Sequence, residues 1–132
     1  MRIILLLIAA VMASSFTSNL SHPNYQIESL KKKSKKTDVI VNYSSTSIDY
    51  FSIQFFNIST SQTFYFSASP NTSGILGTIP EGSYNVTFGP SDPLKWHSYV
   101  VSCGYYMAAK GTHVFTNVLY DDICNYMILS DY

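Results

Sequence analysis

The chain has 132 residues, of which 46% are hydrophobic, 15% aromatic and only 12% charged. This length suffices for one domain with a single core. The formal net charge is zero, but from Thr37 onward two lysines, Lys95 and Lys110, stand against seven acidic residues, a net charge of −5. A net-acidic body argues against nucleic acid as a partner, because phosphate binding needs clustered Lys or Arg.

Residues 1–13 have the pattern of a secretory signal peptide. Arg2 supplies a positive charge, residues 3–12 are an unbroken apolar run, and Val11 and Ala13 match the residues that precede a cleavage site. As a helix, this run reaches about 15 Å, half of a bilayer core, so we expect no stable membrane span. The pattern predicts cleavage after Ala13, or alternatively after Ser15, and a secreted, periplasmic or cell-surface protein.

Residues 14–37 are polar and are predicted to form a flexible basic leader. Its lysines gather within residues 31–36: Lys31, Lys32, Lys33, Lys35 and Lys36. Such a run of like charges is usually a solvated linker. Two further roles stay open: a processing site for a protease that cuts after basic residues, and contact with anionic surface polymers or lipid headgroups.

From residue 38 to residue 132 the sequence predicts an all-β domain. Apolar and polar residues alternate with a period of two, which is typical of half-buried strands, and breakers rich in Ser, Pro, Gly and Asn separate the runs. Tyr84 shares a side with Val86 and Phe88, so we expect it in the core. The expected strands cover residues 39–43, 51–57, 63–67, 84–88, 98–107, 113–119 and 123–129. About seven or eight strands at this spacing predict an antiparallel β-sandwich, with a small closed barrel as the alternative.

Cys103 and Cys124 are the only cysteines. In an exported chain an even number of cysteines indicates a disulfide. Two free thiols are the first alternative. A metal site is the second, although His97 and His113 lack the spacing of zinc ligands.

The segment of residues 74–87 contains a Pro80-Glu81-Gly82 turn followed by Ser83, Tyr84 and Val86. It resembles the central hairpin of prealbumin-like and carboxypeptidase-regulatory-like sandwich domains, and residues 115–118 resemble their C-terminal part. The order of signal peptide, opening strand, hairpin and two late cysteines is similar to that of short exported β-sandwich proteins of Bacteroidetes type. The resemblance implies an immunoglobulin-like or prealbumin-like sandwich, and it transfers no binding residues.

Catalytic motifs are missing from the sequence, and we expect a non-enzymatic protein without a cofactor. There is no Gly-x-Ser-x-Gly elbow, phosphate-binding loop or His-Glu-x-x-His motif. Cys103 and His113 could form a thiol–imidazole pair only if the disulfide were absent. Asp121 and Asp122 could contribute to a calcium site, but two adjacent carboxylates are more often a solvated turn.

Asn-x-Ser/Thr sequons are unusually frequent. Besides Asn19, they fall at Asn42, Asn57, Asn71 and Asn85. In a eukaryotic secretory pathway these four would be candidate glycosylation sites. In a bacterium they would be ordinary polar residues.

Trp96 is the only tryptophan, and Tyr99 follows three residues later. Neighbouring Trp and Tyr side chains on a loop are typical of sugar-stacking sites and protein interfaces. The alternative is that Trp96 closes one end of the core. If ligands bind here, Trp96 and Tyr99 are the candidate residues.

Two classes of function follow from these observations. The preferred one is an exported, non-catalytic module that acts as a structural or adhesion-type interaction protein at the cell surface or outside, with a protein or a cell-surface polysaccharide as its partner. The second is a carbohydrate-binding module that uses Trp96 and exposed tyrosines. An inhibitor of a secreted enzyme is a third and weaker hypothesis. An exposed aromatic row on one sheet would favour sugar binding, whereas exposed edge strands and a buried Trp96 would favour the interaction protein.

Overall fold

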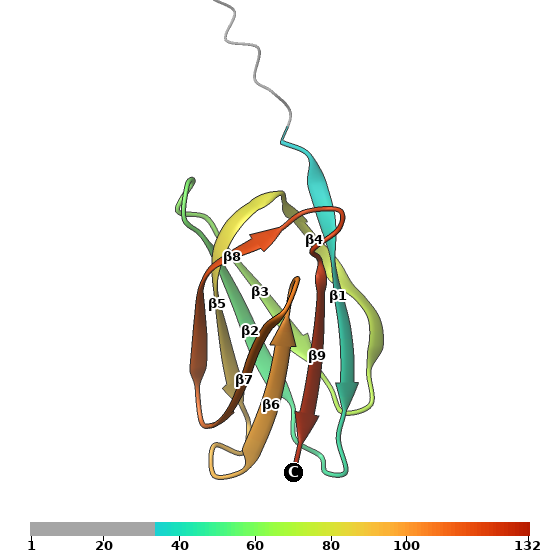
Figure 1. Cartoon of the computed structure of the whole chain (residues 1–132). Coiled ribbons are helices and arrows are strands. Elements are labelled where there is room, and N and C mark those ends of the chain that lie inside the picture. Colours follow the sequence, from blue (N-terminus) through green and yellow to red (C-terminus); the bar gives the residue numbers. More distant parts are fainter. Residues whose placement is uncertain (1–33) are drawn as a thin grey trace, which may run out of the picture. The chain divides into compact units, whose positions relative to one another are not determined.

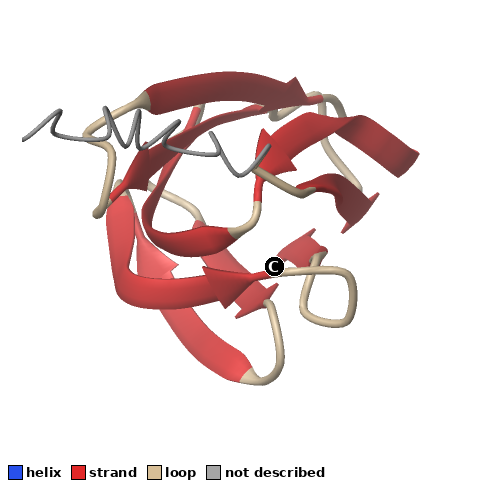
Figure 2. Cartoon of the chain, turned by 90° about the horizontal axis from the view of Figure 1, so that it is seen from above, coloured by secondary structure: helices blue, strands red, loops and turns tan. Residues whose placement is uncertain are grey.

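The computed structural model describes residues 34–132, which form nine strands in two sheets and contain no helix. Figures 1 and 2 show the two sheets face to face, so the predicted all-β sandwich is confirmed. The predicted signal peptide (1–13) and residues 14–33 of the predicted leader lie outside the described residues. The first strand begins at Lys36, slightly before the predicted domain boundary at residue 38.

The five-stranded sheet has the order β4-β1-β9-β6-β7, and the four-stranded sheet has the order β3-β2-β5-β8. The strands of the first are β4 (Ser73–Pro80), β1 (Lys36–Ser44), β9 (Tyr126–Asp131), β6 (Trp96–Val101) and β7 (Tyr105–Lys110). The strands of the second are β3 (Thr63–Ala68), β2 (Phe51–Asn57), β5 (Gly82–Pro90) and β8 (His113–Tyr120).

The core lies between the sheets and is built by the alternate residues that the period-two pattern indicated. Tyr84 is fully buried, as predicted, and so are its strand neighbours Val86 and Phe88. Phe51 and Phe55 of β2 are each surrounded by aromatic rings in edge-to-face contact, with centroids 5.0 Å apart for Tyr43 and Phe51. Such contacts stabilise beyond the area they bury.

The segment 98–107, predicted as one strand, is two strands. A turn at Ser102, Cys103 and Gly104, all with positive φ (30°, 38° and 104°), separates β6 from β7, which pair in antiparallel fashion. Positive φ is rare for residues other than glycine, and this turn contains only one glycine, so the sequence did not indicate it. With this split and with the strand over Ser73–Pro80, residues 34–132 have nine strands instead of the expected seven or eight.

The Pro80-Glu81-Gly82 turn does not close a hairpin. β4 belongs to the five-stranded sheet and β5 to the four-stranded sheet, so the chain crosses between the sheets here, and the predicted hairpin over residues 74–87 is wrong. The Tyr84 hydroxyl donates a hydrogen bond to the Pro80 carbonyl and fastens this corner.

One strand pair departs from the antiparallel pattern. β1 and β9 run parallel, with Ile40 opposite Tyr126 and Asn42 opposite Ile128. The two strands lie far apart in sequence, so no short turn forces them to be antiparallel. β9 thereby joins β1 to β6 at the centre of the five-stranded sheet (Figure 1).

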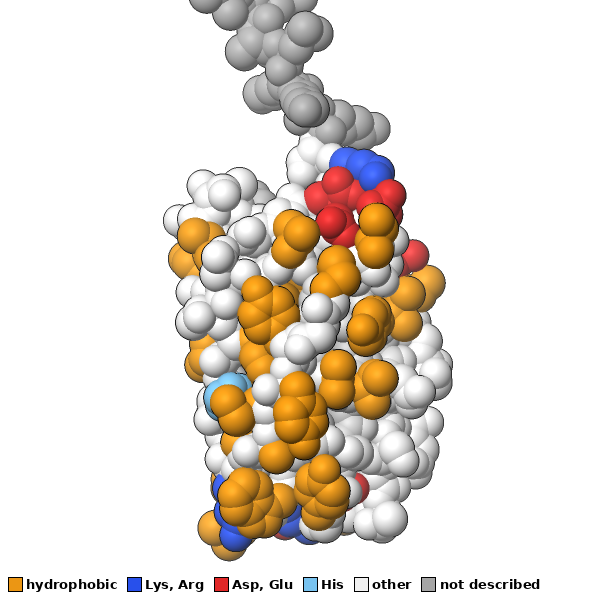
Figure 3. All heavy atoms as spheres, in the orientation of Figure 1, with side chains coloured by type: hydrophobic (Ala, Val, Ile, Leu, Met, Phe, Trp, Pro, Cys, Tyr) orange, Lys and Arg blue, Asp and Glu red, His pale blue; other side chains and the backbone are white. Residues whose placement is uncertain are grey.

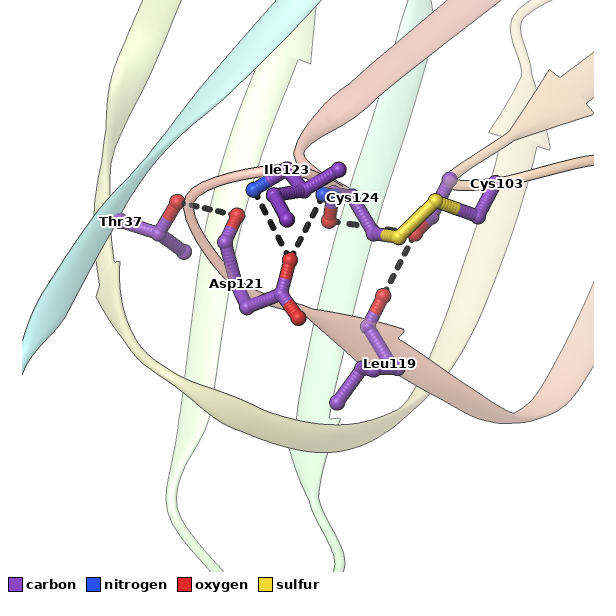
Figure 4. Close-up of a disulfide and its surroundings, with 7 residues drawn as sticks. Thr37, Cys103, Leu119, Asp121, Ile123 and Cys124 are labelled. Atoms are coloured by element: carbon purple, nitrogen blue, oxygen red, sulfur yellow. Dashed lines mark hydrogen bonds between the residues drawn. A yellow bond between two sulfur atoms is a disulfide. The ribbon is translucent and has the colours of Figure 1, made fainter.

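The predicted disulfide between Cys103 and Cys124 is confirmed, with the two Cα atoms 5.1 Å apart. It ties the turn after β6 to the loop before β9 (Figure 4). Beside it, the buried Ser102 hydroxyl donates to the Leu119 and Cys124 carbonyls. The disulfide therefore holds the β6–β7 turn against the loop before β9, and the Ser102 hydrogen bond holds it against the end of β8.

Removing this disulfide is expected to lower the free energy of unfolding by about 3 kcal/mol, because it closes a loop of about twenty residues. Urea denaturation of the oxidised protein and of the Cys103→Ser/Cys124→Ser variant measures the difference. Two thiols that react with a thiol reagent in the native wild-type protein would contradict the bond itself.

Candidate functional site

The outer side of the five-stranded sheet carries six of the large apolar side chains that the fold leaves in solvent. We call this surface the apolar face. Its members alternate with the core residues of the same strands and come from all five strands: Ile75 (β4), Ile40 (β1), Tyr126 and Ile128 (β9), Trp96 and Val100 (β6), and Tyr106 (β7). Figure 3 shows apolar side chains spread over this side of the molecule.

Exposure on this face is substantial. Ile75 and Tyr106 are 63% and 62% exposed, and Trp96 is 51% exposed. The outer side of the four-stranded sheet is different, because its central strands present mostly Ser52, Gln54, Asn85 and Thr87. Its edge strands still expose Tyr65, Val114 and Leu119, but these are fewer than the apolar residues of the apolar face. A larger gathering of exposed apolar side chains is typical of a binding surface.

The side chains of the apolar face are ordered in rows across the strands. Val100 lies opposite both Ile128 and Tyr106, which gives a row of bulky side chains over β9, β6 and β7. The next row has small side chains, because Ser98 lies opposite both Ser130 and Ala108. The Ser98 and Ser130 hydroxyls are hydrogen-bonded to each other at 2.7 Å.

Trp96 does not close the core. It is the first residue of β6 and points outward, with the Lys110 ammonium 5.6 Å from the centre of its ring. The backbone carbonyl of Trp96 accepts a hydrogen bond from the Tyr132 amide. Trp96 is therefore available to a ligand.

Tyr99, the second predicted ligand-binding residue, is fully buried, so this prediction is wrong. Successive side chains of a strand point to opposite faces, so residues three apart lie on opposite sides of the sheet. Tyr99 therefore points into the core because Trp96 points outward. Burial raises the pKa of Tyr99 to about 12. The exposed tyrosine beside Trp96 is instead Tyr132, and Tyr106 is exposed two rows away, opposite Val100.

A buried pair of His97 and Asp49 braces the end of the sandwich near Trp96. The Nε2 atom of His97 lies 2.7 Å from Oδ2 of Asp49, and both side chains are almost completely buried. Asp49 also accepts hydrogen bonds from the Ser91 hydroxyl and from the Asp92 amide. The pair joins the β1–β2 loop, the β5–β6 loop and β6, and its burial leaves it no access to a substrate.

Asp131 braces the same end. Its side chain is 2% exposed and accepts hydrogen bonds from the Ser45 and Ser47 hydroxyls, while Lys95 lies 4.0 Å away. Burial would raise the pKa of Asp131, but these hydrogen bonds outweigh it and lower the pKa. Buried hydrogen bonds to Asp49 and Asp131 thus fix the β1–β2 and β5–β6 loops at this end of the sandwich.

The other candidate residues have structural partners. Cys103 is in the disulfide, so the Cys103–His113 pair is not available as a nucleophile, and His113 stacks on the Tyr99 ring. Asp121 accepts hydrogen bonds from the amides of Ile123 and Cys124, as Figure 4 shows. Asp122 forms an ion pair with Lys35. The two carboxylates therefore serve different contacts.

The sequons lie in different environments. Asn57 is 3% exposed and accepts hydrogen bonds from the Ser59 and Thr60 amides, so it is closed to modification in the folded domain. Asn71 is exposed, and Asn85 is half-buried with its oxygen bound to the Asn117 amide. Asn42 is exposed beside Ile128, so a glycan there would cover part of the apolar face.

Within residues 34–132, no group of three or more His, Cys, Asp or Glu side chains is arranged to hold a metal ion. The same part of the chain has no helix of the length and apolarity that a membrane crossing requires. Comparisons with family models, curated proteins and solved structures gave no match.

Proposed function

We propose that this protein is an exported, non-catalytic interaction module whose apolar face binds a protein partner. The observation that carries the proposal is the gathering of Ile40, Ile75 and Ile128 with Tyr106, Tyr126 and Trp96 on one outer sheet surface. Aliphatic and aromatic side chains without charge are the composition of the centre of a protein interface. A Cys103–Cys124 disulfide supports an oxidising compartment.

Site-specific photo-crosslinking in the producing organism tests the proposal. A photoreactive phenylalanine at Tyr106 is expected to crosslink to a discrete protein, and the crosslink should vanish when Ile128→Lys is added. The matched control is the same probe at Tyr65, which is 73% exposed on the outer side of the four-stranded sheet. Equal crosslinking from both positions, or none from Tyr106, would reject the apolar face as the binding surface.

Carbohydrate binding is the second candidate, favoured by a specific arrangement. The small hydroxyl row of Ser98 and Ser130 lies between the aromatic side chains of Tyr106 and Trp96. Sugar rings stack on aromatic side chains and their hydroxyls bond to such groups. Since Trp96 is the only tryptophan, its fluorescence reports directly on this site. Titration with oligosaccharides should change the emission, and Trp96→Ala should abolish binding while leaving the circular dichroism melt intact.

A further inference from the structure

We infer that the partner of the apolar face is a second copy of this chain, bound face to face about a two-fold axis. The inference rests on the proposed function and names its partner. It is carried by the order of large and small side chains on the face.

At the centre of the face, three adjacent strands each carry a bulky and a small side chain two residues apart. The pairs are Ile128 and Ser130 in β9, Val100 and Ser98 in β6, and Tyr106 and Ala108 in β7. Because the strand register aligns these pairs, the bulky row and the small row run parallel to each other across the sheet.

A two-fold axis that lies between these rows, and runs along them, places the bulky row of each copy over the small row of the other. Ile128 then faces Ser130 of the second copy, and Tyr106 faces Ala108 of the second copy. Sheets that pack face to face lie about 10 Å apart, with interdigitated side chains. Large opposite small on both sides is the self-complementarity that a two-fold interface requires.

The size of the face fits a dimer. A large apolar side chain buries about 150–250 Å², so the exposed fractions of the six largest apolar residues amount to roughly 600 Å². The small residues between them bring the face near the ~800 Å² per partner of a standard interface.

The charge distribution on the apolar face also fits a dimer. Neither row contains a charged side chain, and Lys110 and Asp38 lie at the margins of the face. A two-fold contact therefore brings no like charges together at its centre. On the outer side of the four-stranded sheet, the polar side chains of β2 and β5 separate Tyr65 from Val114 and Leu119, so no comparable apolar row forms there.

Trp96 provides a readout that is specific to this surface. In the dimer it lies over the row of Ile40 and Tyr126 of the second copy, so its emission should shift to the blue as the protein concentration rises. Sedimentation velocity over the same concentrations should show a monomer–dimer equilibrium.

Two substitutions on the face should shift both readouts toward the monomer at concentrations where the wild type is dimeric. Ile128→Lys places a charge over the small row, and Ala108→Arg fills the position opposite Tyr106. Burying one such aliphatic side chain is worth at least tenfold in affinity, so each dissociation constant should rise by roughly tenfold or more. Tyr65→Lys, on the other sheet, should change neither readout, and circular dichroism checks that every variant is folded.

A wild-type chain that stays monomeric throughout overturns the inference, and so does a dimer that Ile128→Lys and Ala108→Arg leave intact. The proposed function is judged separately. If the chain is monomeric but the Tyr106 crosslink to another protein is lost in Ile128→Lys, the apolar face still binds a partner, which is then a different protein.

Discussion

Replacing Tyr84 with alanine is expected to lower the free energy of unfolding by about 3–5 kcal/mol. The ring is fully buried, with its centroid 5.8 Å from Phe55 and 6.2 Å from Tyr120 in edge-to-face contacts. Removing it leaves a cavity between the sheets and frees the corner that its hydroxyl fastens at Pro80. Denaturant unfolding followed by circular dichroism measures the loss.

Two variants separate the causes of this effect. Tyr84→Phe keeps the ring and removes only the hydrogen bond, so it should cost about 1 kcal/mol. Tyr65→Ala removes a ring that is 73% exposed and should cost much less than Tyr84→Ala. A Tyr84→Ala protein as stable as the Tyr65→Ala protein would show that the inward side of β5 has been assigned wrongly.

Replacing Asp49 with alanine is expected to cost a similar amount, about 3–5 kcal/mol, because it leaves a buried charged or polar partner uncompensated. His97 would lose the acceptor of its Nε2 atom, and the Ser91 hydroxyl and Asp92 amide would lose theirs. Asp38→Ala, at a half-buried position of β1, is the control and should change stability little. A small effect of Asp49→Ala would mean that water replaces the carboxylate.

The same pair predicts an acid-sensitive fold. Burial would raise the pKa of Asp49, but hydrogen bonds from Ser91 and His97 outweigh it and hold the pKa below its ordinary value. A lowered pKa in the folded state contributes stability above the unfolded-state pKa, and this stability is lost as the pH falls through the folded-state pKa. Thermal midpoints should therefore drop below about pH 4, and Asp49→Asn should weaken that dependence. A midpoint with the same acid dependence in Asp49→Asn would contradict it.

The sequence predicted the core better than the surface. Alternation along β1, β2 and β5 identified the buried sides of those strands, because an inward side chain must be apolar wherever the sheet is covered. The split of residues 98–107 was missed, since its turn is built from Ser102 and Cys103, which rarely adopt positive φ. The corner at Pro80 was predicted as a hairpin because a turn sequence does not specify which sheet the next strand joins.

The candidate site was predicted only in part. Trp96 was singled out because it is the only tryptophan of the sequence. Tyr99 was added because it is near Trp96 in sequence, although strand periodicity places Tyr99 on the opposite side of the sheet. The apolar face depends on the lateral order of strands, which brings Tyr106 beside Val100 and Ile128. Asp49 and His97 are 48 residues apart and carried no motif, so nothing in the sequence linked them.

The position of β9 has a consequence for biosynthesis. Until it is made, the five-stranded sheet is two unconnected pairs, β4 with β1 and β6 with β7, because β9 is the strand that joins them. A nascent chain that lacks residues 126–131 therefore cannot complete its core, and pairing of strands so distant in sequence is slow. The domain should fold only after its synthesis, so the export proposed above would act on a chain that is still unfolded.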